Sequence, residues 1–296
     1  MRAITITQYG DTDVLRSAEV PAPEPGPGQV RVAVKAAGVN PIDWKIRSGA
    51  MEEVYPVEFP HVLGHEFAGV VDAVGEGAVF AVGDEVFGWA DTGAYAEYAL
   101  ATTIARKPAG LSWAEAASLP VAGETALRVL GELEVKPGET LVIHGASGQV
   151  GRIATQAAVE LGATVVGLAG ASSLDEVKEL GGVPVQYGDG WVSRVRAAAP
   201  DGVDAVFDAA GFGVLGDSVA LLGSPDRLIT IADPAAYAQG LKFSAGGEQT
   251  PAVLEGLVSR ELKLKLGTAY APDDVAEAHR ESATGHAGGK ITLTFE

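Results

Sequence analysis

The chain has 296 residues, of which 47% are hydrophobic, so it can bury large cores and its length favours two domains. Its formal net charge of −18 leaves no basic stripe to neutralise nucleic-acid phosphates and disfavours an anionic membrane surface. The absence of cysteine excludes disulfides, thiolate catalysis and zinc sites built on sulfur. The N-terminus lacks the apolar core of a signal peptide, and no apolar run approaches the ~18 residues of a membrane-spanning helix, so we expect a cytoplasmic protein.

The first third of the chain has the pattern of β-strands separated by turns. A proline- and glycine-rich stretch over residues 20–28 excludes helix and central strand there, and it introduces a predicted strand over Val30–Ala37. Two further strands are predicted over Glu66–Val74 and Gly93–Ala101. The N-terminal part is therefore predicted to be β-rich.

Helical signals begin near residue 112. Ser112 and Glu115 have the spacing of a capping box, which predicts the start of a helix. Pro120 is expected to interrupt this helix, and a second helix is predicted from about Gly123 to Leu133.

From Thr140 onward, strand and helix patterns alternate. Alternation at this spacing predicts a parallel sheet with helices on both faces. The tail returns to a β pattern over Lys290–Phe295, and we expect it to rejoin the first domain. The predicted parallel strands are Leu141–His144, Thr164–Leu168, Val183–Gln186, Ala205–Phe207 and Leu228–Ile231.

A glycine-rich turn follows the first of these strands. Gly148 and Gly151 occupy the second and third places of a G-x-G-x-x-G fingerprint, Ala146 occupies the first place, and Gly145 adds flexibility before the turn. A helical pattern begins at once with Gln149. A strand, a tight turn and a helix N-terminus present backbone N–H groups to a pyrophosphate, so we predict that the chain binds a dinucleotide.

The next strand bears on the choice between NAD and NADP. An NAD site usually carries an acidic residue about 20 residues beyond the glycines, which binds the ribose 2′-hydroxyl. No acid occurs here before Asp175, whereas Ser172 and Ser173 can donate hydrogen bonds to a 2′-phosphate. The sequence therefore favours NADPH.

Six segments occur in an order that resembles the medium-chain dehydrogenase/reductase superfamily, specifically its zinc-free quinone oxidoreductase branch. They are residues 38–47, 64–71, 82–86, 111–117, 135–148 and 288–293. The resemblance implies a β-rich GroES-like substrate domain over 1–115 and 262–296. It also implies an inserted α/β Rossmann domain, a doubly wound parallel sheet, over 116–261. The implied activity is NADPH-dependent reduction of quinones or conjugated enones between the domains, in a homodimer.

The resemblance also assigns cofactor contacts. Lys178 and Tyr187 resemble the Lys and Tyr that bind the 2′-phosphate, although Lys178 can equally be a solvated helix residue. Thr125, Ala209, Ile231 and Ala232 are expected near the nicotinamide. The pyrophosphate is assigned to the turn, with the residues Gly145, Ser147, Gly148, Gln149, Val150 and Gly151.

Part of a zinc site is also present by resemblance. His65 and Glu66 look like residues of the catalytic zinc site of related alcohol dehydrogenases. The sulfur ligand of that site falls at Asn40 here, and the remaining ligand place falls near Val121. Zinc needs three suitable protein ligands, so we predict no bound metal. His65 and Glu66 are then interpreted as a buried polar pair or as a contact to the cofactor.

Three residues are the catalytic candidates. Reduction places negative charge on a carbonyl oxygen, which a hydrogen-bond donor stabilises, and Asn40 and Lys45 lie in a segment that resembles the substrate-side loop of the family. Lys45 can instead belong to a solvated helical face, as can Arg47, and Asn40 can simply hold its loop. Tyr55 resembles the proton donor of mitochondrial-type enoyl thioester reductases but lies a few residues further on, where a turn before Pro56 also explains it.

Several functions fit these observations. The first is an NADPH-dependent reductase of a small neutral quinone or enone, because the acidic chain repels anionic substrates. The second is an enoyl thioester reductase, whose acyl carrier would need a basic dock such as Lys45–Arg47 or Lys263–Lys265. A zinc-dependent alcohol dehydrogenase is a third possibility, but the chain lacks the zinc ligands that this activity requires. A protein of another class, a non-catalytic NADPH-binding sensor, stays open.

Overall fold

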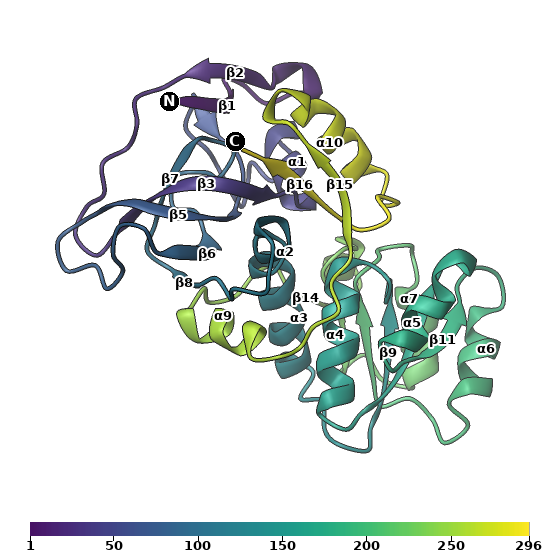
Figure 1. The fold of residues 1–296 in the computed structure, drawn as a ribbon. Coiled ribbons are helices and arrows are strands. Elements are labelled where there is room, and N and C mark those ends of the chain that lie inside the picture. Colours follow the sequence, from purple (N-terminus) through teal and green to yellow (C-terminus); the bar gives the residue numbers. More distant parts are fainter. Residues whose placement is uncertain (296) are drawn as a thin grey trace. The chain divides into compact units, whose positions relative to one another are not determined.

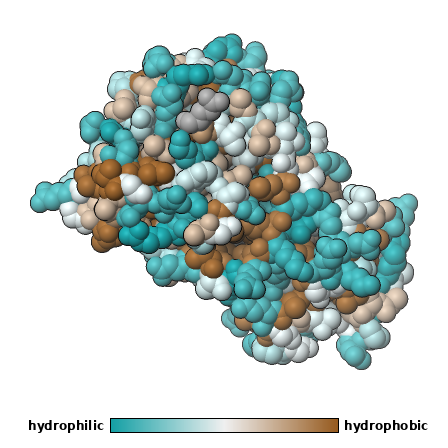
Figure 2. Space-filling model, in the orientation of Figure 1, coloured by the Kyte–Doolittle hydropathy of each residue, from teal (hydrophilic) through white to brown (hydrophobic). Residues whose placement is uncertain are grey.

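The computed structural model describes residues 1–295, which divide into two compact units. The first unit comprises Met1–Val121, Gln249–Arg260 and the segment from Lys265 onward, and the second comprises Ala122–Glu248 and Glu261–Leu264 (Figure 1). Hydrophilic residues cover much of the face visible in Figure 2, in keeping with the charge of the chain. No helix within residues 1–295 is long and apolar enough to cross a membrane.

The first unit is built on two sheets. A three-stranded sheet has the order β2-β1-β4, with β1 Arg2–Ile6, β2 Arg16–Glu19 and β4 His61–Val62. A seven-stranded sheet has the order β15-β16-β3-β5-β6-β8, and its seventh strand, β7, pairs with β3. These strands are β3 Val30–Gly38, β5 Glu66–Val74, β6 Glu85–Trp89, β7 Tyr98–Ala101, β8 Ile104–Arg106, β15 Leu266–Tyr270 and β16 Lys290–Thr294.

The pairing of β16 explains how the two ends of the chain form one unit. Along β3, Val30, Val32 and Val34 are buried while the residues between them are partly exposed, which is the period of two expected for a strand with one face on a core. β16 pairs with β3 in antiparallel fashion, with Thr292 opposite Gly38. The prediction that the tail rejoins the first domain is confirmed.

Short helices complete the first unit. They are α1 Pro41–Ser48, α2 Trp113–Ala117, α9 Pro251–Val258 and α10 Val275–Ala283, with 3-10 turns η1 Thr12–Val14 and η3 Pro272–Asp274. The predicted capping box is confirmed, because Glu115 N–H donates to Ser112 Oγ and Ser112 N–H donates to the Glu115 carboxylate.

The second unit contains a six-stranded parallel sheet of order β11-β10-β9-β12-β13-β14, in which every pairing is parallel. Leu141, Val142 and Ile143 of β9 are all fully buried, because a central parallel strand is covered on both faces. The predicted parallel sheet is confirmed. Its strands are β9 Thr140–His144, β10 Thr164–Ala169, β11 Val183–Gln186, β12 Ala205–Asp208, β13 Leu228–Thr230 and β14 Lys242–Phe243.

Helices connect these strands and flank the sheet (Figure 1). α4 buries Ile153, Ala154, Ala157 and Ala158, so its apolar face packs on β9 and β10. The helices are α3 Pro120–Glu132, α4 Gln149–Glu160, α5 Leu174–Glu179, α6 Trp191–Ala198, α7 Leu215–Leu222 and α8 Ala235–Ala238, with a 3-10 turn η2 Ala171–Ser173.

Three of the differences from the sequence prediction have a clear structural cause. The strand predicted from Gly93 begins only at Tyr98, since Gly93 has a φ of +89° and turns the chain. The expected interruption of the helix is present, since α2 ends at Ala117, but the second helix begins at Pro120 itself, three residues before the predicted Gly123. At the first position of a helix the missing N–H of proline costs nothing. Residues 249–260, predicted within the Rossmann domain, belong to the first unit because α9 packs against β8.

One ion pair of the second unit predicts a dependence of stability on pH. Arg227 binds both carboxylate oxygens of Glu139, at 2.7 and 2.8 Å, and lowers the pKa of Glu139 from 4.5 to about 2. The ion pair therefore stabilises the folded state fully above the pKa of Glu139 in the unfolded chain, about 4.3, and this stabilisation is lost as the pH falls towards 2. Because the pair is partly open to solvent, we expect Glu139→Gln to lower the free energy of unfolding at pH 7 by about 1–2 kcal/mol.

Urea unfolding of Glu139→Gln across this pH range checks the prediction, with the exposed Glu53→Gln as control. The difference from the wild type should shrink between pH 4.5 and pH 2. A difference that does not change with pH would contradict the assigned cause.

Candidate functional site

The glycine-rich turn lies at the carboxyl end of β9. Gly145 follows the strand with a φ of +76°, and its N–H donates to the carbonyl oxygen of Leu168 on β10 at 3.1 Å. Gly148 is the N-cap of α4, in extended conformation, and its N–H donates to the carbonyl of Gly145 at 3.0 Å. Ser147, Gln149 and Val150 share this turn and the first turn of α4. The strand, turn and helix N-terminus are thus arranged as a pyrophosphate site requires.

Gly151 is required by close packing. A Cβ atom at this position would lie 2.2 Å from the carbonyl oxygen of Gly145 and 2.8 Å from Cα of Ala146. Backbone atoms of a tight turn cannot move away cheaply, so only glycine lets α4 approach the turn this closely.

The structure also explains the alanine at the first fingerprint position. Ala146 is fully buried, and a Cβ atom placed on Gly167 of β10 would lie 2.8 Å from its methyl group. Gly167 therefore leaves the space that the Ala146 methyl group fills. Sequence reasoning missed Gly167, because the two positions are 21 residues apart and meet only in the parallel pairing of β9 and β10.

The predicted 2′-phosphate residues lie beyond β10 and β11. Ser172 and Ser173 form part of η2, which follows β10 after Gly170. We call residues 170–173 the serine loop. Tyr187 N–H donates to the carbonyl of Ala169 at 3.1 Å, and its hydroxyl lies 3.6 Å from the position a Cβ would take on Gly170. The structure therefore brings Tyr187 to the serine loop. Lys178 is exposed in the last turn of α5.

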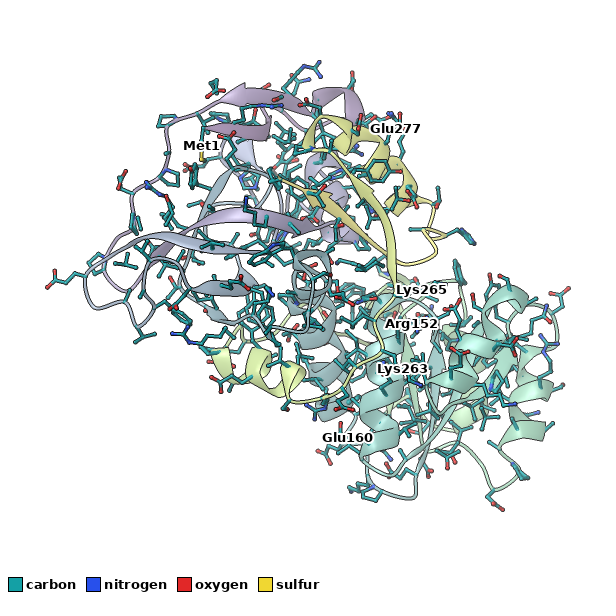
Figure 3. All side chains as sticks on the ribbon, viewed as in Figure 1. Met1, Arg152, Glu160, Lys263, Lys265 and Glu277 are labelled. Carbon is teal, nitrogen blue, oxygen red and sulfur yellow. The ribbon has the colours of Figure 1, made fainter. Side chains whose placement is uncertain are left out.

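An arginine beside this loop was not anticipated. Arg152 lies on α4, is labelled in Figure 3, and pairs with the carboxylate of Glu176 on α5. Glu176 follows Ser173 by three residues, so this pairing offsets a negative charge near the loop. No local pattern in the sequence signals a pair that joins two helices.

The ends of β12 and β13 are fixed by one buried carboxylate. Asp208 accepts hydrogen bonds from the N–H groups of Ala210 and Gly211, and from the hydroxyl of Thr230 at 2.8 Å. The predicted residues Ala209, Ile231 and Ala232 therefore lie at the same sheet edge as the glycine turn: Ala209 N–H donates to the carbonyl of His144, and Ile231 N–H donates to that of Asp208. Thr125 lies on α3.

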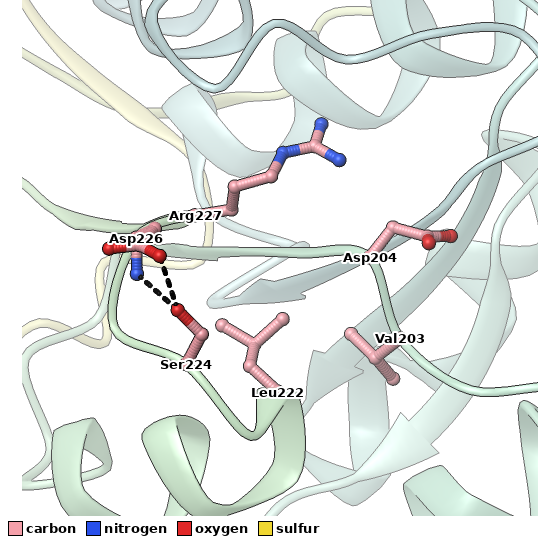
Figure 4. Close-up of a pocket in the computed structure, with 6 residues that line it drawn as sticks. All are labelled: Val203, Asp204, Leu222, Ser224, Asp226 and Arg227. Atoms are coloured by element: carbon pink, nitrogen blue, oxygen red, sulfur yellow. Dashed lines mark hydrogen bonds between the residues drawn. The ribbon is translucent and has the colours of Figure 1, made fainter.

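A cavity of about 310 Å³ opens at the opposite edge of this sheet (Figure 4). Asp204 and Arg227 directly precede β12 and β13, so the cavity lies where these strands begin. Ligands of open parallel sheets bind at the carboxyl ends of the strands. The cavity is therefore not the predicted dinucleotide site.

The first unit contains a buried polar cluster, composed of Asn40, Asp43, His65, Glu66, Tyr95 and Lys290. Asn40 caps α1, and its Nδ2 donates to Glu66 Oε1 at 2.8 Å. Lys290 Nζ lies 2.5 Å from Asn40 Oδ1 and 2.6 Å from Glu66 Oε1. Val121 N–H donates to Glu66 Oε2 at 2.7 Å. Glu66 and Lys290 are 0% and 5% exposed, so they form a buried ion pair satisfied by hydrogen bonds.

Asp43 forms the other half of the polar cluster. Its Oδ1 lies 2.7 Å from Nδ1 of His65, and its Oδ2 accepts from Asn40 N–H at 2.7 Å and Tyr95 hydroxyl at 3.0 Å. Burial alone would raise the pKa of Asp43, but the hydrogen bond and charge of His65 lower it, helped by His279 and by Asn40 N–H. Asp43 is therefore held as a carboxylate.

The three catalytic candidates have different surroundings. The Asn40 amide is buried, and both of its polar atoms are bound within the polar cluster. Lys45 Nζ lies 5.6 Å from the ring of Trp44, and burial lowers the pKa of Lys45. Tyr55 is 42% exposed, and its ring lies 5.7 Å from that of His65. The structure therefore brings Tyr55 close to His65, and it binds Asn40 to Asp43, the partner of His65.

The residues at the three zinc-ligand places do not fit a zinc ion. His65 Nδ1 is bound to Asp43, and the Asn40 amide binds Glu66 and Lys290. The side chain of Val121 has no atom that can bind a metal, and its N–H donates to Glu66. The Lys290 ammonium supplies the positive charge beside Glu66. Within residues 1–295, no three His, Cys, Asp or Glu side chains are grouped to hold a metal.

Comparisons with known proteins match both units. A family model described as an alcohol dehydrogenase GroES-like domain matches residues 26–120, and one described as a zinc-binding dehydrogenase matches residues 150–279. Human quinone oxidoreductase is 31% identical over 99% of this chain and 97% of its own length. The pikromycin polyketide synthase component PikAII of Streptomyces venezuelae is 40% identical over 72% of this chain and 6% of its own. The structure of mycobacterial Rv1454c complexed with NADPH matches with a TM-score of 0.86 and 30% identity, covering 100% of both chains.

Proposed function

Since the chain belongs to the quinone oxidoreductase family of the medium-chain dehydrogenase/reductase superfamily, we propose that it is a zinc-independent, NADPH-dependent reductase of quinones or α,β-unsaturated carbonyl compounds. The observation that carries the proposal is the glycine turn at the carboxyl end of β9 with a serine loop, free of acid until Asp175, at the end of β10. The acceptor is expected to be small and neutral, because the chain carries a net charge of −18. We also expect a homodimer.

The residues at the sheet edge fit an NADPH molecule. The turn from Gly145 to Gly151 would hold the pyrophosphate, while Ser172, Ser173, Lys178 and Tyr187 would hold the 2′-phosphate. Thr125, Ala209, Ile231 and Ala232 would line the nicotinamide. The cofactor supplies the hydride, so the protein has to bind, orient and exclude water. The similarity to the NADPH complex supports this cofactor choice.

A substitution in the serine loop tests the preference for NADPH. We expect Ser172→Asp to weaken NADPH binding about tenfold or more, because a carboxylate repels the 2′-phosphate, and to leave NADH binding within about twofold. Titration of cofactor fluorescence measures both dissociation constants. Ser193→Asp, an exposed serine on α6, is the matched control. Equal weakening of NADPH binding and NADH binding would contradict the assignment of the serine loop to the 2′-phosphate.

The reaction itself is tested by loss of NADPH absorbance with four acceptors offered in parallel: 1,4-benzoquinone, 9,10-phenanthrenequinone, a short enone and crotonyl-CoA. We expect turnover of a quinone or of the enone, and no effect of EDTA, because the polar cluster does not supply zinc ligands. Loss of activity in EDTA that returns with zinc would contradict the zinc-independent reading.

An enoyl thioester is the second candidate substrate, supported by the similarity to a polyketide synthase component and by the position of Tyr55 beside His65. Both candidate basic docks are weakened by the structure. Arg47 is buried, and Lys263 Nζ donates to the carbonyl of Glu179. Preference for crotonyl-CoA would promote this candidate, and NADPH binding without any turnover would support the sensor.

A further inference from the structure

His65 has no assigned role once zinc is excluded, yet it is held in a defined position. It directly precedes β5, and Gly64 before it has a φ of +97°. A Cβ on Gly64 would lie within 3 Å of the Tyr95 ring and backbone, so the chain fits against Tyr95 only with glycine there. The His65 side chain is 19% exposed, so it is not closed off from solvent.

Asp43, the partner of His65, is also held in place by several hydrogen bonds. The Asp43 carboxylate is fully buried, and it accepts hydrogen bonds from Asn40 N–H, the Tyr95 hydroxyl and His65 Nδ1. A carboxylate can only accept, so the hydrogen of the His65 ring that faces Asp43 is on Nδ1. A carboxylate that fixes the orientation of an imidazole and stabilises its protonated form is a recurrent arrangement for proton transfer at the other ring nitrogen.

We propose that His65 is the proton donor of the reduction and that Asp43 is its positioning residue. This inference rests on the proposed function and deepens it. Bound NADPH would supply a hydride to the acceptor, and the reduction would leave an electron pair on the carbonyl oxygen of the acceptor. That pair takes the proton from Nε2 of the His65 imidazolium: the N–H bond breaks, its electrons stay on the ring, and an O–H bond forms. Neutral His65 then regains a proton from water.

The charges around His65 favour the protonated ring. Burial lowers the pKa of His65, but the hydrogen bond and charge of Asp43, together with the charge of Glu66, raise it above its ordinary value. Burial lowers the pKa of the nearby His61, and the charge of His65 lowers it further. The Tyr55 ring lies 5.7 Å from the His65 ring, centroid to centroid. His65 therefore keeps its protonated imidazolium form up to a higher pH than a free histidine does.

The other candidate donors are less suited to this step. Burial, with the charge of Asp43, raises the pKa of Tyr55, which makes its hydroxyl a weaker acid. Among residues 1–295 the Lys45 ammonium has no ion pair, and its nearest ring contact is with Trp44. Of these three residues, His65 is the one that a buried carboxylate holds in place through a hydrogen bond, while its side chain stays partly exposed.

The test compares His65→Gln with His61→Gln, a partly exposed histidine on neighbouring β4. We expect His65→Gln to lower kcat with a quinone or enone about 100-fold, within the usual range for losing a general acid, and to leave the NADPH dissociation constant within about twofold. His61→Gln should stay close to the wild type. Circular dichroism melts establish that both variants are folded.

The pH profile gives a readout that a merely structural role would not move. In the wild type, kcat should fall at high pH as His65 loses its proton, and this fall should be absent in His65→Gln. In Asp43→Asn the fall should move to lower pH, because the carboxylate that raises the pKa of His65 is gone. Wild-type turnover that His65→Gln leaves within about twofold would overturn this assignment alone. No turnover by the wild type would overturn the proposed function, and this assignment with it.

Discussion

Lys290→Met is expected to lower the free energy of unfolding of the first unit by about 3–5 kcal/mol, which is a large fraction of the stability of a typical domain. The ammonium of Lys290 binds Glu66 Oε1 at 2.6 Å and Asn40 Oδ1 at 2.5 Å, and both partners are buried. Without Lys290, the Glu66 carboxylate keeps the N–H groups of Asn40 and Val121 but loses its neutralising charge. The cost is that of a buried charge left uncompensated.

The matched control is the double variant Lys290→Met with Glu66→Gln, which removes both charges. It should recover part of the lost stability, because no charge is left buried: the single amide oxygen at position 66 can accept from Val121 N–H, and its NH2 group can donate to Asn40 Oδ1, which no longer binds Lys290. Urea unfolding followed by tryptophan fluorescence measures the effect, since three of the four tryptophans, Trp44, Trp89 and Trp113, lie in the first unit. A single variant that costs less than about 1 kcal/mol, or a double variant no better than the single, would contradict the account.

The second large effect is expected at the glycine turn. Gly151→Ala should weaken NADPH binding by about 100-fold or more and lower the stability of the second unit by about 1–3 kcal/mol. The new methyl group would lie 2.2 Å from the carbonyl oxygen of Gly145, so either α4 or the turn must move. Movement of either one displaces the backbone N–H groups that are proposed to bind the pyrophosphate.

Gly131→Ala provides a control of the same chemistry. Gly131 lies on α3 in the second unit, and nothing lies within 4 Å of the position its Cβ would take. Alanine there should leave cofactor binding unchanged and raise stability by about 0.5–1 kcal/mol, because alanine favours helix over glycine. Titration with NADPH and thermal unfolding of the two variants give the comparison. Normal binding by Gly151→Ala would remove the glycine turn from the cofactor site.

Much of the architecture could be predicted from local patterns. The apolar run of β9, the capping box at Ser112 and the β pattern of the tail each depend on neighbours within a few residues, and each matches the structure. The boundary at 249–260 was missed because the packing of α9 on β8 joins segments far apart in the chain. Gly93 was taken into a strand because its positive φ has no signature in hydrophobic periodicity.

The residues of the candidate sites could likewise be predicted only where they are neighbours in the sequence. The glycine turn is contiguous, so its residues could be named from the sequence. The ion pair of Glu66 with Lys290 joins positions that are 224 residues apart, and the pair of Arg152 with Glu176 joins two helices. The accommodation of Ala146 by Gly167 also requires the pairing of two strands. These partners are set by tertiary packing, which a single sequence does not record.

The function that we propose for the chain is the oxidation of NADPH by a quinone without help from zinc. The most direct measurement is the rate of NADPH loss when 1,4-benzoquinone is added to EDTA-treated protein, with NADH in a parallel reaction and Gly151→Ala as the binding-deficient control. We expect many turnovers per chain with NADPH, slower oxidation of NADH, and much slower turnover by Gly151→Ala at the same NADPH concentration. NADPH that binds to the wild type but is not oxidised, or is oxidised only after zinc is restored, would contradict it.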